Sequence, residues 1–337
     1  MKPNLFSIAT KELSQDAFIT WLLQWADDSC LNENMELCNV GKLFIKKLIS
    51  LKYQSENPEI KNVNAGRQWE NIDVWAEIND KEYVIIIEDK VNTDEHDNQL
   101  ERYKKTVEDY YGENVKIVFV YLKTGLECFD NIQKVKYKGW EYFSRKDLID
   151  FLENQKLENE IYSDFVSNLS EIQKESESFT KFEKLNSWEA TKGLYLYIES
   201  NLVAADKAHW DYVSNPNGGF LGMWFHSTPL ASEQNCNLYL QIENYCSDKI
   251  NLFVKICGKW NSTLDDLYDI LHLIQHNAKP LNLEIYKPEK YRIGEYTSVA
   301  IVNDVFIKKE NGNLDLENMM DKINKAIILI DTVTTKM

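Results

Sequence analysis

The chain has 337 residues, of which 44% are hydrophobic and 12% aromatic, and its formal net charge is −16. This composition can fill a sizeable core and excludes wholesale disorder, while the length fits one large domain or two. The negative charge is unlike that of a strongly basic nucleic-acid binder. The sequence has no run of about 18 apolar residues, so we expect no membrane span.

The first half of the sequence alternates helical and strand patterns, which is typical of an α/β domain. A turn-forming Asn79-Asp80-Lys81 separates two of the predicted strands, and Ser144 is a predicted helix cap. In chain order we predict helices at 11–25 and 40–51, strands at 69–78 and 82–91, a helix at 97–111, strands at 116–122 and 140–143, and helices from 145 and at 158–171.

The second half contains strands in runs with flanking helices, which predicts an α+β domain. A charged, Ser-containing segment at 171–184 is the best boundary, so we expect a first domain at 1–180 and a second at 185–337. The same segment also fits a long exposed helix. In chain order we predict a helix at 188–202, strands near 220–226, 237–243 and 249–258, a helix at 264–276, strands near 283–286 and 297–307, and a helix at 316–335.

The predicted strands on either side of Asn79-Asp80-Lys81 bring charged residues together. Side chains alternate along a strand, so Asp73 lies on one face of the first strand, and Glu88 and Lys90 share a face of the second. If Asp80-Lys81 form the turn tip, Asp73 lies directly opposite Glu88, and if Asn79-Asp80 form it, the two are diagonal neighbours. Opposed residues have Cβ atoms about 4.5–5.5 Å apart, close enough for two carboxylates to share a divalent cation. An ordinary ion pair at a strand end is the alternative.

These residues resemble the PD-(D/E)XK nuclease superfamily. The most similar branch has a Glu-bearing helix, an Ile-Asp strand, an Ile-Glu-x-Lys strand and a helical Gln-Leu-x-x-Tyr. The sequence contains the four parts in this order, over about residues 5–150, as Glu12, Ile72-Asp73, Ile87-Glu88-Asp89-Lys90 and Gln99-Leu100-Glu101-Arg102-Tyr103. Asn71-Ile72 replaces the Pro that often precedes the Asp.

The resemblance implies a restriction-endonuclease-like fold, in which helices flank a mixed central sheet. It also implies that Asp73 and Glu88 ligate Mg²⁺ or Mn²⁺ with the backbone carbonyl of Asp89, and that Lys90 orients or activates the attacking water. By the same resemblance, Glu12 is a further ligand or water-holder and Gln99 orients the site. From helical spacing, Asp16, one turn after Glu12, is an equal candidate for facing the site.

Charge limits what the sequence implies about the substrate. Residues 1–180 carry 22 Lys and Arg against 34 Asp and Glu, so a polynucleotide must be held by a local basic strip, by metal ions or by a partner. Arg102, Lys104 and Lys105 are the nearest basic group and could meet phosphates, but a solvated helix face is the better explanation of them. An acidic stretch at 93–98 lacks the Gly and the bidentate Glu of a calcium loop and is interpreted as a helix cap.

The leading hypothesis is therefore a cytoplasmic, bacterial, metal-dependent nuclease that hydrolyses DNA. Its second domain would select a target or mediate assembly with a second copy or a protein partner. Two alternatives remain open: a catalytically silent binding or regulatory module, and a nuclease subunit that needs a partner to bind its substrate. Six cysteines without a Cys-x-x-Cys pair predict reduced, mostly buried thiols. The sequence does not distinguish DNA from RNA.

Overall fold

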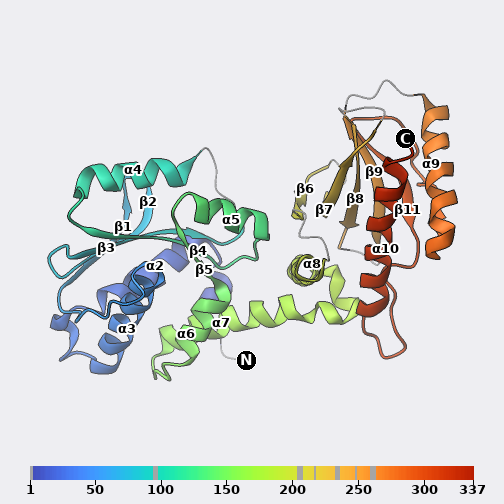
Figure 1. Cartoon of the computed structure of the whole chain (residues 1–337). Helices are drawn as coiled ribbons and strands as arrows, with labels where there is room; N and C mark the ends of the chain where they lie inside the picture. The colour runs from blue at the N-terminus through green and yellow to red at the C-terminus, as the bar shows by residue number, and fades with distance from the viewer. Residues whose placement is uncertain are drawn as a thin grey trace. The chain divides into compact units, whose positions relative to one another are not determined.

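The computed structural model describes residues 3–93, 98–202, 208–215, 218–231, 236–246, 249–258 and 263–337. The chain divides into two compact units, whose helices and strands are labelled in Figure 1. Unit 1 contains residues 1–127 and 131–174, and unit 2 contains residues 128–130 and 175–337. The division falls within the segment 171–184, where a helix runs to Glu177 and short 3-10 helices follow.

Unit 1 is built on a five-stranded mixed sheet with the order β1-β2-β3-β4-β5. β1, β2 and β3 are antiparallel neighbours, whereas β3, β4 and β5 run parallel. This is the mixed central sheet of the predicted fold class. Its strands are β1 (Val63–Trp69), β2 (Ile72–Ile78), β3 (Tyr83–Lys90), β4 (Lys116–Lys123) and β5 (Glu141–Ser144).

Helices cover both faces of this sheet (Figure 1). One face packs against α2, α3, α6 and α7, and the other packs against α4 and α5. β3 lies in the middle and is buried along its whole length, which explains its apolar sequence on both faces. The helices are α1 (Leu5–Ile8), α2 (Glu12–Gln24), α3 (Met35–Lys52), α4 (Gln99–Tyr111), α5 (Phe129–Tyr137), α6 (Arg145–Glu153) and α7 (Glu160–Glu177).

The hairpin between β2 and β3 has the register predicted for a tip at Asp80-Lys81. Val74 pairs with Ile87 and Ile78 with Tyr83, so the same register places Asp73 opposite Glu88. Asp80 and Lys81 both have positive φ, as a type I′ hairpin turn requires. The predicted cap of α6 is also confirmed, because Ser144 and Asp147 form a reciprocal capping box.

Some predicted element boundaries are wrong. The strand predicted at 69–78 is two strands, because Glu70 and Asn71 form a turn with positive φ between β1 and β2. The pattern did not predict β1, α1, α5 or the strand β6 of unit 2. β1, α5 and β6 each bury few side chains, so their hydrophobic periodicity is weak. The helix cap predicted at 93–98 includes residues 94–97, which lie outside the described residues, and α4 begins at Gln99.

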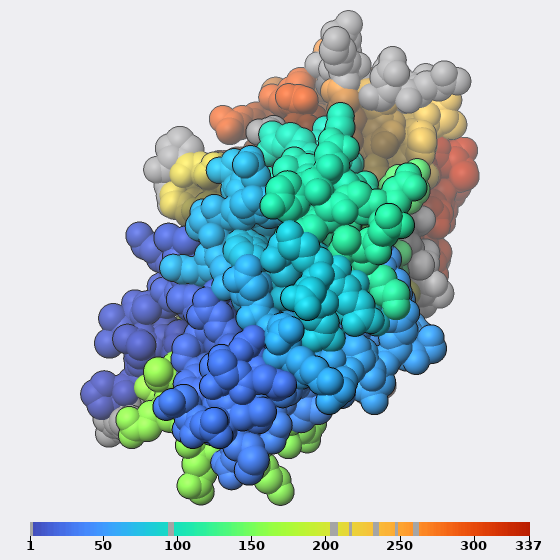
Figure 2. All heavy atoms as spheres, turned by 90° about the vertical axis from the view of Figure 1, so that its left-hand side faces the viewer, coloured from blue at the N-terminus to red at the C-terminus, as the bar shows by residue number. Residues whose placement is uncertain are grey.

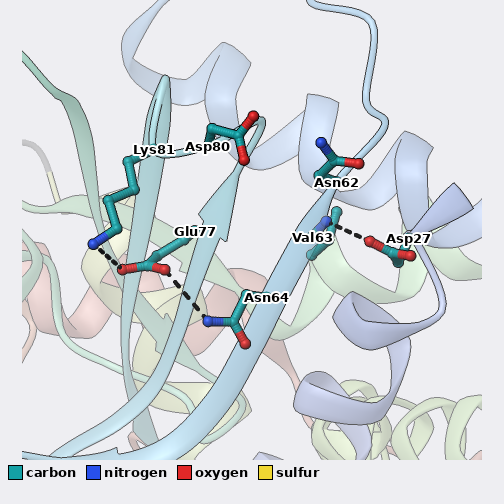
Figure 3. Close-up of a pocket in the computed structure, with 7 residues that line it drawn as sticks. All are labelled: Asp27, Asn62, Val63, Asn64, Glu77, Asp80 and Lys81. Atoms are coloured by element: carbon teal, nitrogen blue, oxygen red, sulfur yellow. Dashed lines mark hydrogen bonds and ion pairs between the residues drawn. The ribbon is translucent and has the colours of Figure 1, made fainter. Parts of the chain in front are cut away.

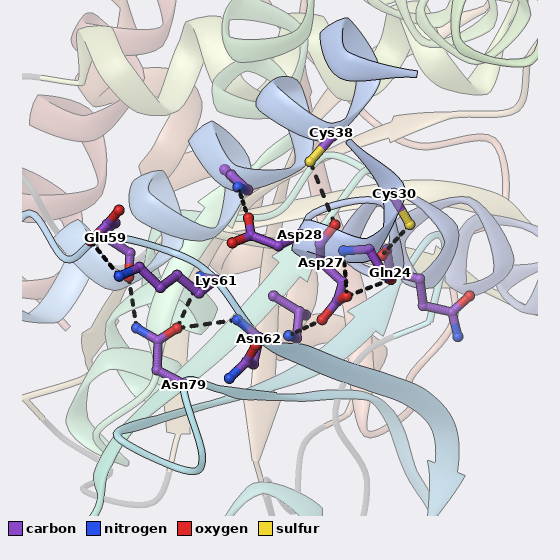
Figure 4. Close-up of polar contacts among 12 residues, drawn as sticks. Gln24, Asp27, Asp28, Cys30, Cys38, Glu59, Lys61, Asn62 and Asn79 are labelled. Atoms are coloured by element: carbon purple, nitrogen blue, oxygen red, sulfur yellow. Dashed lines mark hydrogen bonds and ion pairs between the residues drawn. The ribbon is translucent and has the colours of Figure 1, made fainter. Parts of the chain in front are cut away.

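The connection between α3 and β1 is fixed by polar contacts with the hairpin turn (Figure 4). The Asn79 side chain donates to the Glu59 carbonyl over 2.7 Å and accepts from the Lys61 amide over 3.0 Å. The Asp27 carboxylate accepts from the Val63 amide over 2.8 Å. These bonds satisfy backbone groups at the start of β1 and hold this edge strand against β2.

Unit 2 contains a six-stranded antiparallel sheet with the order β10-β11-β9-β8-β7-β6. α9 and α10 pack on one face of it (Figure 1). This arrangement is α+β, as predicted, although the strand predicted at 297–307 ends at Val302. The elements are α8 (Trp188–Asn201), β6 (His209–Val213), β7 (Phe220–Pro229), β8 (Cys236–Asn244), β9 (Ile250–Gly258), α9 (Leu264–Ala278), β10 (Ile285–Tyr286), β11 (Tyr296–Val302) and α10 (Leu316–Thr334).

Two further predictions concern the cysteines, expected to be reduced and mostly buried, and the absence of a membrane span. All six cysteines are free thiols, but only Cys38, Cys128 and Cys236 are buried, and the other three are partly exposed. Within the described part of the chain, no helix combines the length and apolar character needed to cross a bilayer.

We predict that Gly41→Ala destabilises the protein, although alanine favours a helix by about 1 kcal/mol over glycine. A Cβ at position 41 of α3 would lie 2.6 Å from the Leu22 carbonyl oxygen and 2.9 Å from the Ala26 amide nitrogen, both backbone atoms of the preceding segment. Overpacking of this kind costs about 1–3 kcal/mol. The measurement is the midpoint of urea denaturation, with Asn39→Ala on an exposed position of α3 as the control. An unchanged or higher midpoint for Gly41→Ala would contradict the close helix packing.

Candidate active site

The last three residues of β3 are charged and buried. The exposed fractions of Glu88, Asp89 and Lys90 are 0%, 1% and 7%. They follow Tyr83–Ile87, an apolar run that places β3 between β2 and β4. Charged side chains are almost never buried to this degree without partners. The apolar pattern of β3 therefore breaks at its last three residues, as is expected where a functional site lies.

On the α4 side of the sheet, Asp73, Glu88 and Lys90 form one cluster. The Lys90 ammonium contacts the Glu88 carboxylate and lies 3.9 Å from the nearer Asp73 oxygen. The Asp89 amide donates to the same Asp73 oxygen over 3.0 Å. Antiparallel pairing of β2 with β3 therefore brings two acids and one base to a single face, as the strand period predicts.

The acids of this cluster hold their protons more tightly than free carboxylic acids do. Burial, followed by the charge of Asp73, raises the pKa of Glu88 to about 8. Burial also raises the pKa of Asp73. For Lys90 burial acts to lower the pKa, but Glu88 and Asp73 reverse this effect and raise it. Two carboxylates forced together in a low-polarity site repel each other unless positive charge is present.

Glu12 and Gln99 reach this region from two helices. The Glu12 carboxylate, at the first turn of α2, accepts from the Val91 amide over 3.1 Å and from the Thr93 hydroxyl over 2.7 Å. Gln99, at the start of α4, donates to the Tyr103 hydroxyl over 2.9 Å. Tyr103 is buried, and the carboxylates of Glu88 and Asp73 help to raise its pKa. The four parts of the sequence motif thus converge on the end of β3.

Asp89 points to the opposite face, toward α2. Its carboxylate accepts from the Gln15 amide, and Gln15 in turn accepts from the Thr124 hydroxyl over 2.8 Å. Arg145 donates to the Thr124 carbonyl over 3.0 Å. The sequence pattern did not identify Gln15, Thr124 or Arg145, because polar residues on helices and loops give no periodic signal.

Asp16 belongs with Asp89 on this face. Its exposed fraction is 1%, and burial together with the charge of Asp73 raises its pKa to about 6. Burial is the main cause that raises the pKa of Asp89, and the charge of Asp16 raises it further. The hydrogen bond with Asp89 acts in the other direction on Asp16 and lowers its pKa. Glu12, one turn earlier on the same helix, accepts from the Val91 amide just beyond the end of β3, and Asp16 faces Asp89.

The donor set fits a hard divalent cation. Both carboxylate oxygens of Glu88 are buried, and apart from the ion pair with Lys90 they have no hydrogen-bond partner. One carboxylate oxygen of Asp16 and one of Asp89 are also buried and have no hydrogen-bond partner. Within the described ranges, no three Asp, Glu, His or Cys side chains already form a metal-holding cluster, and the Lys90 ammonium supplies the positive charge between Asp73 and Glu88. Buried carboxylate oxygens of this kind suit Mg²⁺ or Mn²⁺.

A depression near the hairpin tip lies away from these residues (Figure 3). It has a volume of about 340 Å³ and is lined by residues that include Asp27, Asn64 and Glu77. Glu77 is bound there by Lys81 and Asn64, each at 3.3 Å. Glu77 lies four positions after Asp73 on β2, about 13 Å away at the usual rise, so this depression is not part of the cluster.

The face of unit 1 in Figure 2 is formed by the N-terminal helices, in blue, and by the strands and α4 that follow, in cyan to teal. Of the basic residues predicted near the site, Arg102 and Lys105 on α4 are exposed and Lys104 is partly exposed.

Comparison with known proteins gave one match. Residues 3–192, more than half of the chain, match the family model described as the PD-(D/E)XK nuclease superfamily. The searches of curated proteins and of solved structures found no match.

We predict that Gln15→Leu destabilises the protein by about 2 kcal/mol. The substitution leaves the buried Asp89 carboxylate without its donor and the Thr124 hydroxyl without its acceptor, and each such loss costs about 1–3 kcal/mol. Gln133→Leu, the same change at an exposed position of α5, is the control and should cost less than about 1 kcal/mol. Equal denaturation midpoints for the two variants would show that the Gln15 contacts do not support the site.

Proposed function

The chain belongs to the PD-(D/E)XK nuclease superfamily, and from this premise we propose that unit 1 hydrolyses phosphodiester bonds of DNA with a divalent metal ion. The observation that carries the proposal is the cluster at the end of β3, in which the partly exposed Asp73 meets Glu88 and Lys90, both of which are buried. The family match supports a nuclease in general. The choice of DNA, the metal and the residue roles are our own.

Asp73 and Glu88 would hold Mg²⁺ or Mn²⁺, with Glu12 and the backbone carbonyl of Asp89 as further ligands. When bound, such an ion polarises the phosphodiester and provides a nucleophilic water near neutral pH. The two carboxylates point to one face because β2 and β3 pair in the observed register. Burial of Glu88 lowers the local polarity, which strengthens each electrostatic interaction there.

Lys90 would orient the attacking water and stabilise the negative charge that develops on the phosphate. Its ammonium is held by Glu88 and Asp73, and both carboxylates keep it protonated by raising its pKa. Gln99 would orient the site through Tyr103, to which it donates a hydrogen bond. Glu12 ties the end of β3 to α2 through the Val91 amide. These residues fix the cluster before any substrate arrives.

The net charge of −16 means that the chain has no excess of Lys and Arg with which to hold a polynucleotide. Non-specific binding of a polynucleotide needs Lys and Arg that displace counterions from several phosphates. We therefore propose that unit 2 selects the target or mediates assembly, with a second copy or a protein partner completing the substrate surface.

We predict that Asp73→Ala and Lys90→Ala each lower DNA cleavage at least a hundredfold, because each removes a group that binds the ion or stabilises the transition-state charge. The measurement is cleavage of plasmid and linear DNA with Mg²⁺ or Mn²⁺, with an RNA of equal length beside them. Asp80→Ala and Lys81→Ala change the same residue types at the exposed tip of the same hairpin and should retain activity. Cleavage that survives both site substitutions would overturn the assignment.

We predict that the chain binds Mn²⁺ at millimolar concentration or below, and that Glu88→Gln weakens this binding at least tenfold. The neutral amide keeps the shape of the side chain but removes the charge that attracts the ion. Calorimetric titration measures the effect, with Asp80→Ala as the matched control. No binding by the unmodified chain would favour a catalytically silent member of the family. Binding without cleavage would favour a subunit that needs a partner.

A further inference from the structure

Unit 2 has a groove on the sheet face that is turned away from α9 and α10. It has a volume of about 640 Å³, and all the residues that line it belong to unit 2. In β8, Leu238, Leu240 and Ile242 point into the core, so the alternate residues Tyr239 and Gln241 point into the groove. The volume is that of a small-molecule site.

Aromatic side chains form the walls of this groove. Phe220 and Trp224 come from β7, Tyr239 from β8 and Tyr296 from β11. Tyr296 is 64% exposed, whereas Tyr239 is buried. Flat aromatic surfaces brought together from three strands are suited to stacking against a planar ring.

The floor of the groove is polar and has no net charge. Lys255 on β9 forms a buried ion pair with Glu243, with 3.1 Å between the ammonium nitrogen and the carboxylate oxygen. Gln241 donates to the same oxygen over 2.9 Å and accepts from the Tyr239 hydroxyl over 3.3 Å. An ammonium has three N–H donors and a primary amide has two, so Lys255 and Gln241 each keep donor capacity for a ligand.

The Tyr239 hydroxyl adds an acceptor to the same groove. Its proton is donated to Gln241, so its oxygen keeps lone pairs that can accept a hydrogen bond from a ligand. His226 also lines the groove, but its Nε2 donates to Asp331 of α10 over 2.7 Å, so its ring is held from the other face of the sheet.

These features favour one class of ligand. A purely apolar molecule would cover the polar groups of Lys255, Gln241 and Tyr239 without bonding to them, at a cost for each group. An anion gains little, because Glu243 already balances the charge of Lys255. A neutral planar ring whose edge carries both donors and acceptors would satisfy the floor and stack on the walls.

We propose that this groove binds a nucleobase. The groove site does not depend on the nuclease chemistry of unit 1, because its residues all lie in unit 2 and its test measures binding. The base can belong to a free nucleoside or to a nucleic-acid strand, and the two sources share the same ring chemistry.

The test is calorimetric titration of the full chain carrying Lys90→Ala, which prevents cleavage of the ligand. The ligands are adenosine, guanosine, cytidine, uridine, and single-stranded DNA and RNA of five nucleotides, with indole as a planar ring that has a donor but no acceptor. We expect saturable 1:1 binding of at least one nucleoside and weaker binding of indole. A nucleoside that matches the oligonucleotides in affinity indicates a free ligand, and a tighter oligonucleotide indicates a strand.

Two substitutions assign the binding to the groove. Tyr296→Ala removes an exposed stacking wall and should weaken binding roughly tenfold without affecting folding. Gln241→Leu should weaken the nucleoside more than indole, because it removes only hydrogen bonds. Tyr286→Ala, at a tyrosine of β10 that is 52% exposed and does not line the groove, is the matched control. No nucleoside binding at millimolar concentration, equal binding of indole, or unchanged affinity in Tyr296→Ala would each overturn the proposal.

Discussion

Burial of the charged end of β3 is the constraint on which the rest of unit 1 depends. Ionisable side chains are costly in a protein interior unless charges and hydrogen bonds compensate. On one face Lys90 compensates Glu88 and Asp73, and on the other Gln15 donates to Asp89. The placement of α2 and α4 can be understood from this requirement, because α2 provides Glu12, Gln15 and Asp16 and α4 provides Gln99 and Tyr103.

The same constraint explains why the site is electrostatically strained as it stands. Burial raises the pKa of Glu88 to about 8 and of Asp16 to about 6, so the fold disfavours the charged form of both acids. Proteins retain such groups where function needs them, at a cost in stability that the surrounding core offsets. The core around β3, with α2, α3, α6 and α7 on one face and α4 and α5 on the other, provides that support.

The two units differ in how their sheets are covered and in where their polar groups are gathered. Unit 1 covers both faces of its sheet and concentrates charge at the end of one strand. In unit 2, α9 and α10 pack on one face of an antiparallel sheet, and the groove lies on the other, with aromatic walls and the Lys255–Glu243 pair in its floor. A chain with a net charge of −16 gains from such a division, because binding through rings and neutral hydrogen-bonding groups does not require an excess of cations.

The sequence by itself determined which residues share a face at the end of β3. The strand period of two places Asp73, Glu88 and Lys90 together under either turn. The family resemblance added Glu12 to them, and helical spacing added Asp16 as an equal candidate. Local patterns also located most helices and strands. They did not predict β1, α5 or β6, which bury few side chains, or the contacts of Gln15, Thr124 and Arg145. Only the tertiary structure decided these, because the partners of Gln15 lie 74 and 109 residues away in the chain and no local periodicity records such a distance.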